Sequence, residues 1–145
     1  MKRFITLSLV TLFLSSPALA QTPGSRPTRI QEAWQQVYKD NPDLPLENQY
    51  VNRETGKVDP NNTLVSRLVR YHYFIKGRPV NYRLDWKYTI ADFLGANELM
   101  SASTYPGAEN LRKNPFESDR AIIQKLNRKQ RDALIQSLVN VFTPR

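Results

Sequence analysis

The sequence predicts an all-α protein: a small bundle of about five short helices, joined by proline-rich loops and without disulfides. Apolar residues recur at intervals of three and four positions in five separate stretches, and no stretch shows the strict alternation typical of a β-strand. The segments between these stretches contain proline, glycine and asparagine, which favour turns. The 145-residue chain has no cysteine, so it must fold without disulfides.

Residues 1–20 are predicted to be a signal peptide. Lys2 and Arg3 precede an uncharged apolar run over residues 4–14, and a small-x-small cleavage site ends at Ala20. The run is shorter than the roughly 20 apolar residues that span a bilayer, and no later segment could span one. We therefore expect export to a periplasm or a thylakoid lumen, with cleavage after Ala20. An uncleaved N-terminal membrane anchor is the alternative.

The exported chain is expected to begin with a flexible linker over residues 21–27, followed by a single helical domain over residues 28–145. Thr28 is the expected N-cap of the first helix, because Gln31 stands at the capping-box spacing. The helix should end before Pro42. Its apolar face would consist of Ile30, Ala33, Trp34, Val37 and Tyr38.

Residues 41–58 lack helical periodicity and are expected to be extended, with a short hairpin around Gly56. A second helix is predicted to follow, with Asp59 as its cap, Pro60 as its first residue and Gly77 as its C-terminal stop. The residues expected on its buried face are Leu64, Val65, Leu68, Val69, His72 and Ile75.

A third helix is predicted between a cap at Asp85 and a stop at Gly95. Residues 96–115 are expected to be irregular, a fourth helix to cover residues 117–126, and Asn127 to cap the last helix. The residues expected in the core from these helices are Trp86, Ile90, Phe93, Leu94, Ile122, Ile123, Leu126, Leu134, Ile135, Leu138 and Phe142.

The composition excludes several kinds of site. Without cysteine there is no thiolate metal site, and one histidine cannot form a multi-histidine site. The five glycines are isolated, so there is no phosphate-binding glycine loop. His72 lies among apolar positions, which favours a hydrogen-bonded core histidine over a catalytic one, although composition does not exclude a Ser–His–Asp site. We expect no cofactor and no metal.

Carboxylates near aromatic residues leave one enzymatic alternative, a cell-wall glycan hydrolase. Such an enzyme needs two carboxyl groups across a sugar cleft, one of them with a raised pKa. The candidates are Asp85 beside Trp86, Asp92 beside Phe93, and Glu98. The simpler interpretation makes Asp85 a helix cap and places the other two on the surface, so a non-catalytic protein is favoured.

Basic residues interleaved with aromatic ones are the most distinctive pattern. The chain carries 21 Lys and Arg against 13 Asp and Glu, and the net charge falls from +8 to +6 when residues 1–20 with their two bases are removed. Between residues 67 and 87, six basic residues accompany a single acid. The aromatic residues among them are Tyr71, Tyr73, Phe74, Tyr82, Trp86 and Tyr88. A second basic run consists of Arg112, Lys113, Arg120, Lys125, Arg128, Lys129 and Arg131.

We therefore expect a binding protein that docks an acidic protein or the surface of a membrane complex. Anionic lipid and acidic glycan are the other ligands that suit this charge, whereas the export signal disfavours nucleic acid. Arg67 and Arg70 are expected on the side of the second helix opposite its apolar face. The predicted partner-binding residues are Arg67, Arg70, Lys76, Arg78, Arg83 and Lys87.

Two stretches resemble a known family. Residues 57–63 (KVDPNNT), leading into residues 68–71, and residues 113–118 (KNPFES) are similar to parts of the small extrinsic oxygen-evolving-complex protein of cyanobacterial photosystem II. That resemblance implies a helical, lumenal protein without a cofactor. Residues 75–105 have no counterpart in the family, and residues 125–128 (KLNR) replace its glycine turn. As a whole, the chain is also similar to other small exported cyanobacterial proteins.

Overall fold

The computed structural model describes residues 26–143 and confirms an all-α fold. The signal peptide predicted over residues 1–20 lies outside the described residues, as does most of the linker predicted over 21–27. Within residues 26–143 there are isolated β-bridges but no β-strand. The helices are α1 (Arg26–Asp40), α2 (Leu64–Arg70), the π-helical turn η1 (Tyr71–Ile75), α3 (Arg83–Phe93), α4 (Phe116–Lys125) and α5 (Arg128–Phe142).

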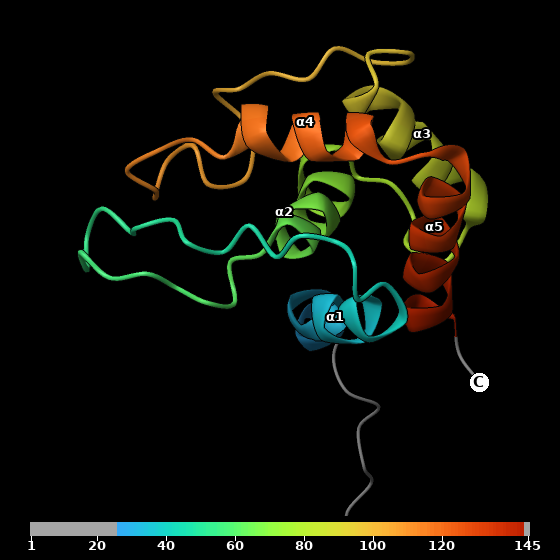
Figure 1. Cartoon of the computed structure of the whole chain (residues 1–145), viewed down its shortest axis with the longest axis horizontal. Helices are drawn as coiled ribbons and strands as arrows, with labels where there is room; N and C mark the ends of the chain where they lie inside the picture. Colours follow the sequence, from blue (N-terminus) through green and yellow to red (C-terminus); the bar gives the residue numbers. More distant parts are fainter. Residues whose placement is uncertain (1–25, 144–145) are drawn as a thin grey trace, which may run out of the picture.

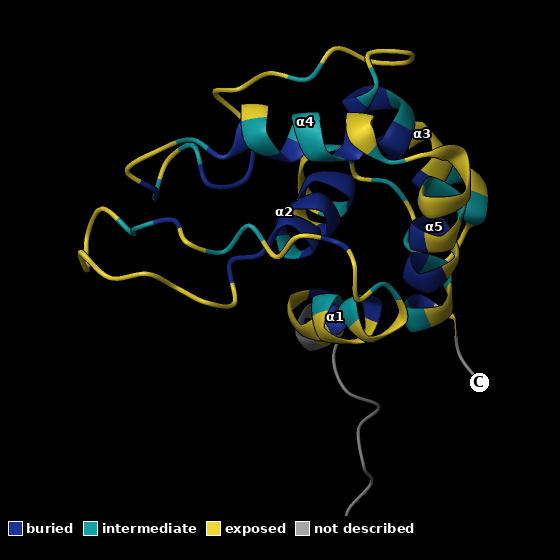
Figure 2. Ribbon diagram, viewed as in Figure 1, coloured by how far each residue is buried: buried dark blue, intermediate teal, exposed yellow. Residues whose placement is uncertain are grey.

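The helices pack around α2 and α5 (Figure 1). α1 lies against both α2 and α5, and α3 lies against α4 and α5. The loop before α2 reaches out to one side of the helices, and the loop before α4 passes above α4 and descends on that same side. Figure 2 shows that buried residues line the inner sides of the helices, while the tips of both loops are exposed. The helices thus form the core, and the loops build a surface beside α2.

Trp86 lies at the centre of the hydrophobic core. It is fully buried, and its indole Nε1–H donates a hydrogen bond of 2.8 Å to the Val80 carbonyl oxygen. The His72 ring stacks on it with 3.6 Å between ring centroids, and the Phe142 ring stacks at 6.0 Å. Because Trp86 belongs to α3, His72 to η1 and Phe142 to α5, this stack joins three elements far apart in the chain.

The first two helices begin at different residues from those predicted. α1 begins at Arg26, two residues before Thr28, because a proline such as Pro27 fits the first turn, where its missing N–H has no helical partner. α2 begins at Leu64 and is capped by Thr63, not by Asp59. Asp59 instead accepts a hydrogen bond from the backbone N–H of a residue two positions later, in a turn that precedes the helix.

The later helix ends agree more closely with prediction. Asn127 caps α5 in a capping box with Gln130, as expected. Gly95 follows the end of α3 with a φ of 71°, a left-handed conformation that glycine adopts without strain. Asp85 is not the cap of α3, because the helix already begins at Arg83 and Asp85 therefore lies in its first turn.

η1 explains a second difference from prediction. The backbone N–H of Lys76, just after η1, donates a hydrogen bond to the carbonyl oxygen of Tyr71, five residues earlier. The turn therefore holds one residue more than an α-helical turn. That extra residue rotates the following positions away from the core. Ile75, predicted to be buried on the same face as His72, is therefore 44% exposed.

Candidate functional site

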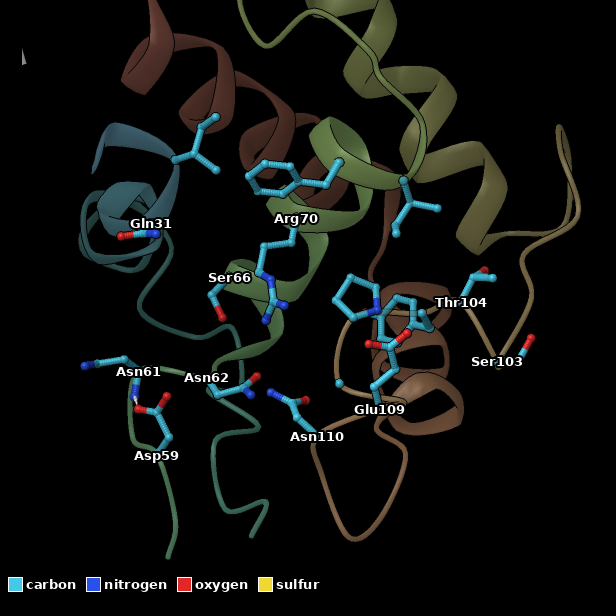
Figure 3. A pocket seen from close by; sticks show the side chains of 16 residues that line it. Gln31, Asp59, Asn61, Asn62, Ser66, Arg70, Ser103, Thr104, Glu109 and Asn110 are labelled. Atoms are coloured by element: carbon cyan, nitrogen blue, oxygen red, sulfur yellow. Dashed lines mark hydrogen bonds between the residues drawn. The ribbon is translucent and has the colours of Figure 1, made fainter. Parts of the chain in front are cut away.

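A groove of about 630 Å³ runs along α2 and is a candidate ligand site among the described residues (Figure 3). Its floor begins with a residue just before α2 and continues along α2 and η1 at a spacing of four residues, which places these side chains on one side. Ile30 and Gln31 of α1 form one wall, and the loop before α4 forms the other. The floor residues are Asn62, Ser66, Arg70 and Phe74.

Contacts within the loop and with α4 hold the loop wall in place. The Tyr105 hydroxyl donates a hydrogen bond of 2.6 Å to the Asp119 carboxylate of α4. Gly107 has a φ of 104°, and a Cβ atom there would lie 2.8 Å from the Leu111 side chain, so only glycine fits. The Asn114 side chain donates to the Ala102 carbonyl oxygen at 2.8 Å. The groove therefore has a defined shape.

Arg67 corrects one prediction: it is a buried structural residue and not a partner-binding one. Its side chain is completely buried, and its Nε and Nη2 atoms form a bidentate salt bridge with Asp119 at 2.6 and 2.7 Å. Nη1 donates to Asn62 and Nη2 to the Glu47 carbonyl oxygen. Burial alone would lower the pKa of Arg67, but the hydrogen bonds and charge of Asp119 outweigh burial and raise it. No partner can reach this guanidinium in the folded protein.

Arg78 and Lys76 are already paired with carboxylates. The Arg78 guanidinium donates to Asp92 at 2.6 Å and to Glu98 at 3.2 Å, and the Lys76 ammonium also contacts Glu98. Burial raises the pKa of Asp92, but hydrogen bonds from Arg78, Glu98 N–H and Asn97 outweigh it, so the pKa is below its usual range. The positive charges of Lys76 and Arg78 are therefore largely neutralised within the protein.

The same contacts weaken the glycan-hydrolase alternative. Asp92, predicted to be exposed, is buried against Arg78 and Tyr71. Hydrogen bonding to Lys76, followed by its charge, lowers the pKa of Glu98. A general acid needs a raised pKa, so neither carboxyl group has the property that glycan hydrolysis requires.

Arg83 and Lys87 lie on α3, away from the groove lining. The Arg83 guanidinium donates to Gln136 at 2.7 Å and lies 3.4 Å from Asp132, both on α5. Lys87 is exposed one turn further along α3. The six predicted residues therefore do not form one surface, because one is buried, two are neutralised, two lie on α3, and only Arg70 enters the groove.

Arg70 is the candidate binding residue of the groove. Its side chain is exposed, and none of the salt bridges or hydrogen bonds between described side chains involves it. Figure 3 shows its guanidinium extending from α2 into the groove, on the side of Asn62 and Asn110, with Glu109 on the loop wall and Asp59 at the lower end. An arginine in this position can bind a carboxylate through two parallel N–H groups.

The sequence did not identify the amide-rich lining of the groove. Gln31, Asn61, Asn62 and Asn110 all line it, from three different segments of the chain. The four-residue spacing from Asn62 to Phe74 was visible in the sequence, but nothing showed that the loop before α4 lies beside it. Phe74 was grouped with the aromatic residues, and its 60% exposure at the groove became evident only in the structure.

His72 is a core histidine, as predicted. It is fully buried, with ring nitrogens 2.8 Å from the Thr89 hydroxyl and 3.0 Å from the Pro79 carbonyl oxygen. Burial lowers its pKa to about 4 despite the hydrogen bond to Pro79. Because both ring nitrogens are engaged and the ring stacks on Trp86, the imidazole is not available to a substrate.

Within residues 26–143, no cluster of histidine and carboxylate side chains has the arrangement of a metal site. In the same part of the chain, no helix has the length and apolar character needed to cross a bilayer. Comparisons with protein-family models, curated proteins and solved structures gave no match to the chain.

Proposed function

We propose that the protein is an exported, non-catalytic accessory protein that holds an acidic, extended segment of a partner protein in the α2 groove. One observation carries the proposal. The exposed guanidinium of Arg70 projects into a groove of about 630 Å³ without a carboxylate partner among the described residues. A carboxylate from a partner would complete the site.

The other groups of the groove suit a polypeptide. The side chains of Gln31, Asn61 and Asn110 each offer a donor and an acceptor, as an extended backbone requires. At one end, Phe74 and Ile75 are 60% and 44% exposed and offer an apolar contact. The groove volume lies in the range of about 300 to 1,000 Å³ that is typical of ligand sites. An acidic residue at Arg70 followed by an apolar one at Phe74 is the partner chemistry that we propose for this groove, whose lining also carries the carboxylates of Asp59 and Glu109.

The compartment and the class of partner rest on the sequence. The charged start, apolar run and small-x-small site support export, and the resemblance to an extrinsic photosystem protein supports a lumenal or periplasmic accessory role. We propose a membrane complex as the source of the acidic segment. Contacts between charges of this kind speed association and weaken as salt concentration rises.

The experiment is a capture assay from native membranes with the tagged chain that begins at Gln21. Bound protein is eluted with rising salt, and its affinity is then measured with the purified partner. Arg70→Glu should lower that affinity at least about tenfold, because a charged hydrogen-bonded contact of about 1.5 to 3 kcal/mol becomes a repulsion. The measurement is a titration of labelled protein with the partner.

Lys57→Glu is the matched control, because Lys57 is exposed in the loop before α2 and the change in net charge is the same. It should leave the affinity nearly unchanged. Arg67 is not a suitable test residue, because its replacement would disturb the core and not only the groove. If Arg70→Glu binds the partner as tightly as Lys57→Glu, the groove is not the docking site.

A further inference from the structure

α3 carries large apolar side chains on its outer side as well as on its buried side. Trp86, Ile90 and Phe93 face the core. Leu84 and Tyr88 stand one turn apart on the outer side and are 58% and 45% exposed. Tyr82, just before the helix, is also exposed. No described element covers this side of the helix, so apolar surface remains available there.

Basic residues lie along one flank of this apolar strip. Arg83 contacts Asp132 and Gln136, so the start of α3 lies beside the middle of α5. The side chains of Arg120 and Gln124 donate to the Phe93 carbonyl oxygen, so the end of α3 lies beside α4. The flank of α3 that faces α4 and α5 therefore carries Arg83 and lies beside Arg120.

The net positive charge of the described residues is concentrated on residues 112–131, which include α4 and the start of α5. Residues 26–143 hold 18 basic and 13 acidic residues, and residues 112–131 alone hold seven basic and two acidic ones. The local excess of five equals the whole excess of the described chain. One of the two acids, Asp119, is buried against Arg67 and does not offset the surface charge. Lys125, Arg128 and Lys129 are exposed, and none of the salt bridges between described residues involves them.

We propose that this surface, the α3 face, rests on the headgroup layer of an anionic lipid bilayer. The α3 face is defined as Tyr82, Arg83, Leu84, Lys87, Tyr88, Lys125 and Arg128. Leucine and tyrosine enter the boundary between headgroups and acyl chains, and lysine and arginine extend their charged ends to lipid phosphates. The proposal concerns a different surface and different residues from the α2 groove.

The distribution of charge favours a lipid surface over an acidic protein. The cations come from α3 and from the corner between α4 and α5, on one flank of an apolar strip, and Lys87, Lys125 and Arg128 form none of the salt bridges between described residues. A bilayer supplies diffuse negative charge over such an area and an apolar layer directly beneath it. An acidic protein would need carboxylates matched in position to each cation and an apolar patch between them.

Vesicle sedimentation tests the proposal with the chain that begins at Gln21. This chain keeps every described helix and omits the apolar run over residues 4–14, which would itself bind lipid. Vesicles contain either phosphatidylcholine alone or phosphatidylcholine with about one third phosphatidylglycerol, whose charge attracts basic residues. The protein should sediment with the anionic vesicles at low salt, stay in solution with the neutral ones, and be released as salt rises.

Two double variants locate the binding surface. Lys87→Gln with Arg128→Gln should lower the partition constant about 25-fold, from about fivefold for each cation near an anionic surface. Leu84→Ser with Tyr88→Ser should also lower it at unchanged charge, because apolar area no longer enters the interface. All four side chains are exposed or lie outside the core, so circular dichroism should show the helical content unchanged.

Lys39→Gln with Lys57→Gln is the control pair, with the same loss of charge at exposed positions in α1 and in the loop before α2. It should change the partition constant less than about threefold, because screening makes distant charges weak. An equal loss in the control pair, or no sedimentation of the intact chain with anionic vesicles at low salt, would overturn the proposal. If Lys87→Gln with Arg128→Gln instead weakens binding of a protein partner while vesicle binding is unchanged, the α3 face docks an acidic protein and the lipid proposal is wrong.

The two proposals can fail separately. Arg70→Gln should abolish capture of the acidic partner and leave vesicle binding within about threefold, because Arg70 is not part of the α3 face. Leu84→Ser with Tyr88→Ser should have the opposite effects. If both variants lower both kinds of binding, the groove and the α3 face belong to a single interface, and the lipid assignment is overturned.

Discussion

Arg67 has a different role in the structure from the one that the sequence predicts. In the sequence it is one of six cations in a basic stretch, whereas in the fold it is the most completely paired of them. Its guanidinium bonds to Asp119, Asn62 and the Glu47 backbone, and it lies 5.1 Å above the Tyr50 ring. The sequence does not reveal this pairing, because Asp119 is 52 residues away from Arg67.

Breaking the Arg67–Asp119 pair from one side should be strongly destabilising. Arg67→Met should lower the free energy of unfolding by about 3 to 5 kcal/mol, because Asp119 would remain buried without its partner. Arg67→Met with Asp119→Leu should cost less than Arg67→Met alone, because no unpaired charge is left. Urea unfolding followed by circular dichroism measures both. A double variant less stable than the single one would contradict this account of the pair.

His72 should make the stability of the protein depend on pH in a defined window. Its pKa is about 4 in the folded protein and about 6.5 in an unfolded chain, so below pH 6.5 the unfolded state binds the extra proton. The stabilisation is complete above about pH 6.5, falls as pH decreases, and is lost below about pH 4. The total amounts to about 3 kcal/mol, from 1.36 kcal/mol for each pH unit between the two pKa values.

Proton NMR of the untagged chain measures this titration directly, because the chain contains a single histidine. The ring resonances should shift with a midpoint near pH 4. A midpoint near pH 6.5 would mean that the ring is solvated in the folded protein. The burial of His72, its stack on Trp86 and its role in the pH dependence would then all be wrong.

At the scale of the element, the sequence predicted which stretches are helical but not all of their ends. Apolar spacing identified the cores of all five helices, because burial of one helix face leaves a period that can be read directly. The capping box at Asn127 was also readable, because both of its partners lie within three residues. The ends of α1 and α2 were missed, because turns and caps compete locally and tertiary packing decides between them.

The start of α2 provides a test of that competition. Thr63→Ala should lower the free energy of unfolding by about 1 kcal/mol, because the Ser66 backbone N–H loses the side-chain oxygen that now accepts its hydrogen bond. Asp59→Ala should cost only a few tenths of a kcal/mol, because Asp59 bonds within an exposed turn. Thermal unfolding of the two variants compares them. A larger loss for Asp59→Ala would place the cap where the sequence pattern predicted it.

The groove depends on information that sequence patterns do not carry. Residues 96–115 show no period, and nothing in them indicates that Tyr105 is buried against α4 or that Gly107 closes onto Leu111. These contacts place the loop beside α2 and so create the second wall. Arg70 could be proposed from charge alone, but its amide-bearing neighbours could not, because they come from segments that meet only in the folded chain.

At the scale of the whole molecule, charge and packing divide the surface into two regions of different character. The α2 groove is rich in amides and carries one free cation among its described residues, whereas the α3 face combines most of the exposed aromatic surface with a dense group of bases. An accessory protein held on a bilayer by the α3 face could present the groove to a complex in that bilayer.

The contact between α1 and α5 also affects when the hydrophobic core can form during synthesis. α1 packs against α5, and the Asn41 side chain just after α1 donates to Ser137, 96 residues away. During synthesis, α1 leaves the ribosome before α5, so its apolar face has no α5 to cover it until that 15-residue helix has emerged. The core is therefore completed only when α5 joins it, and until then the apolar face of α1 stays partly uncovered.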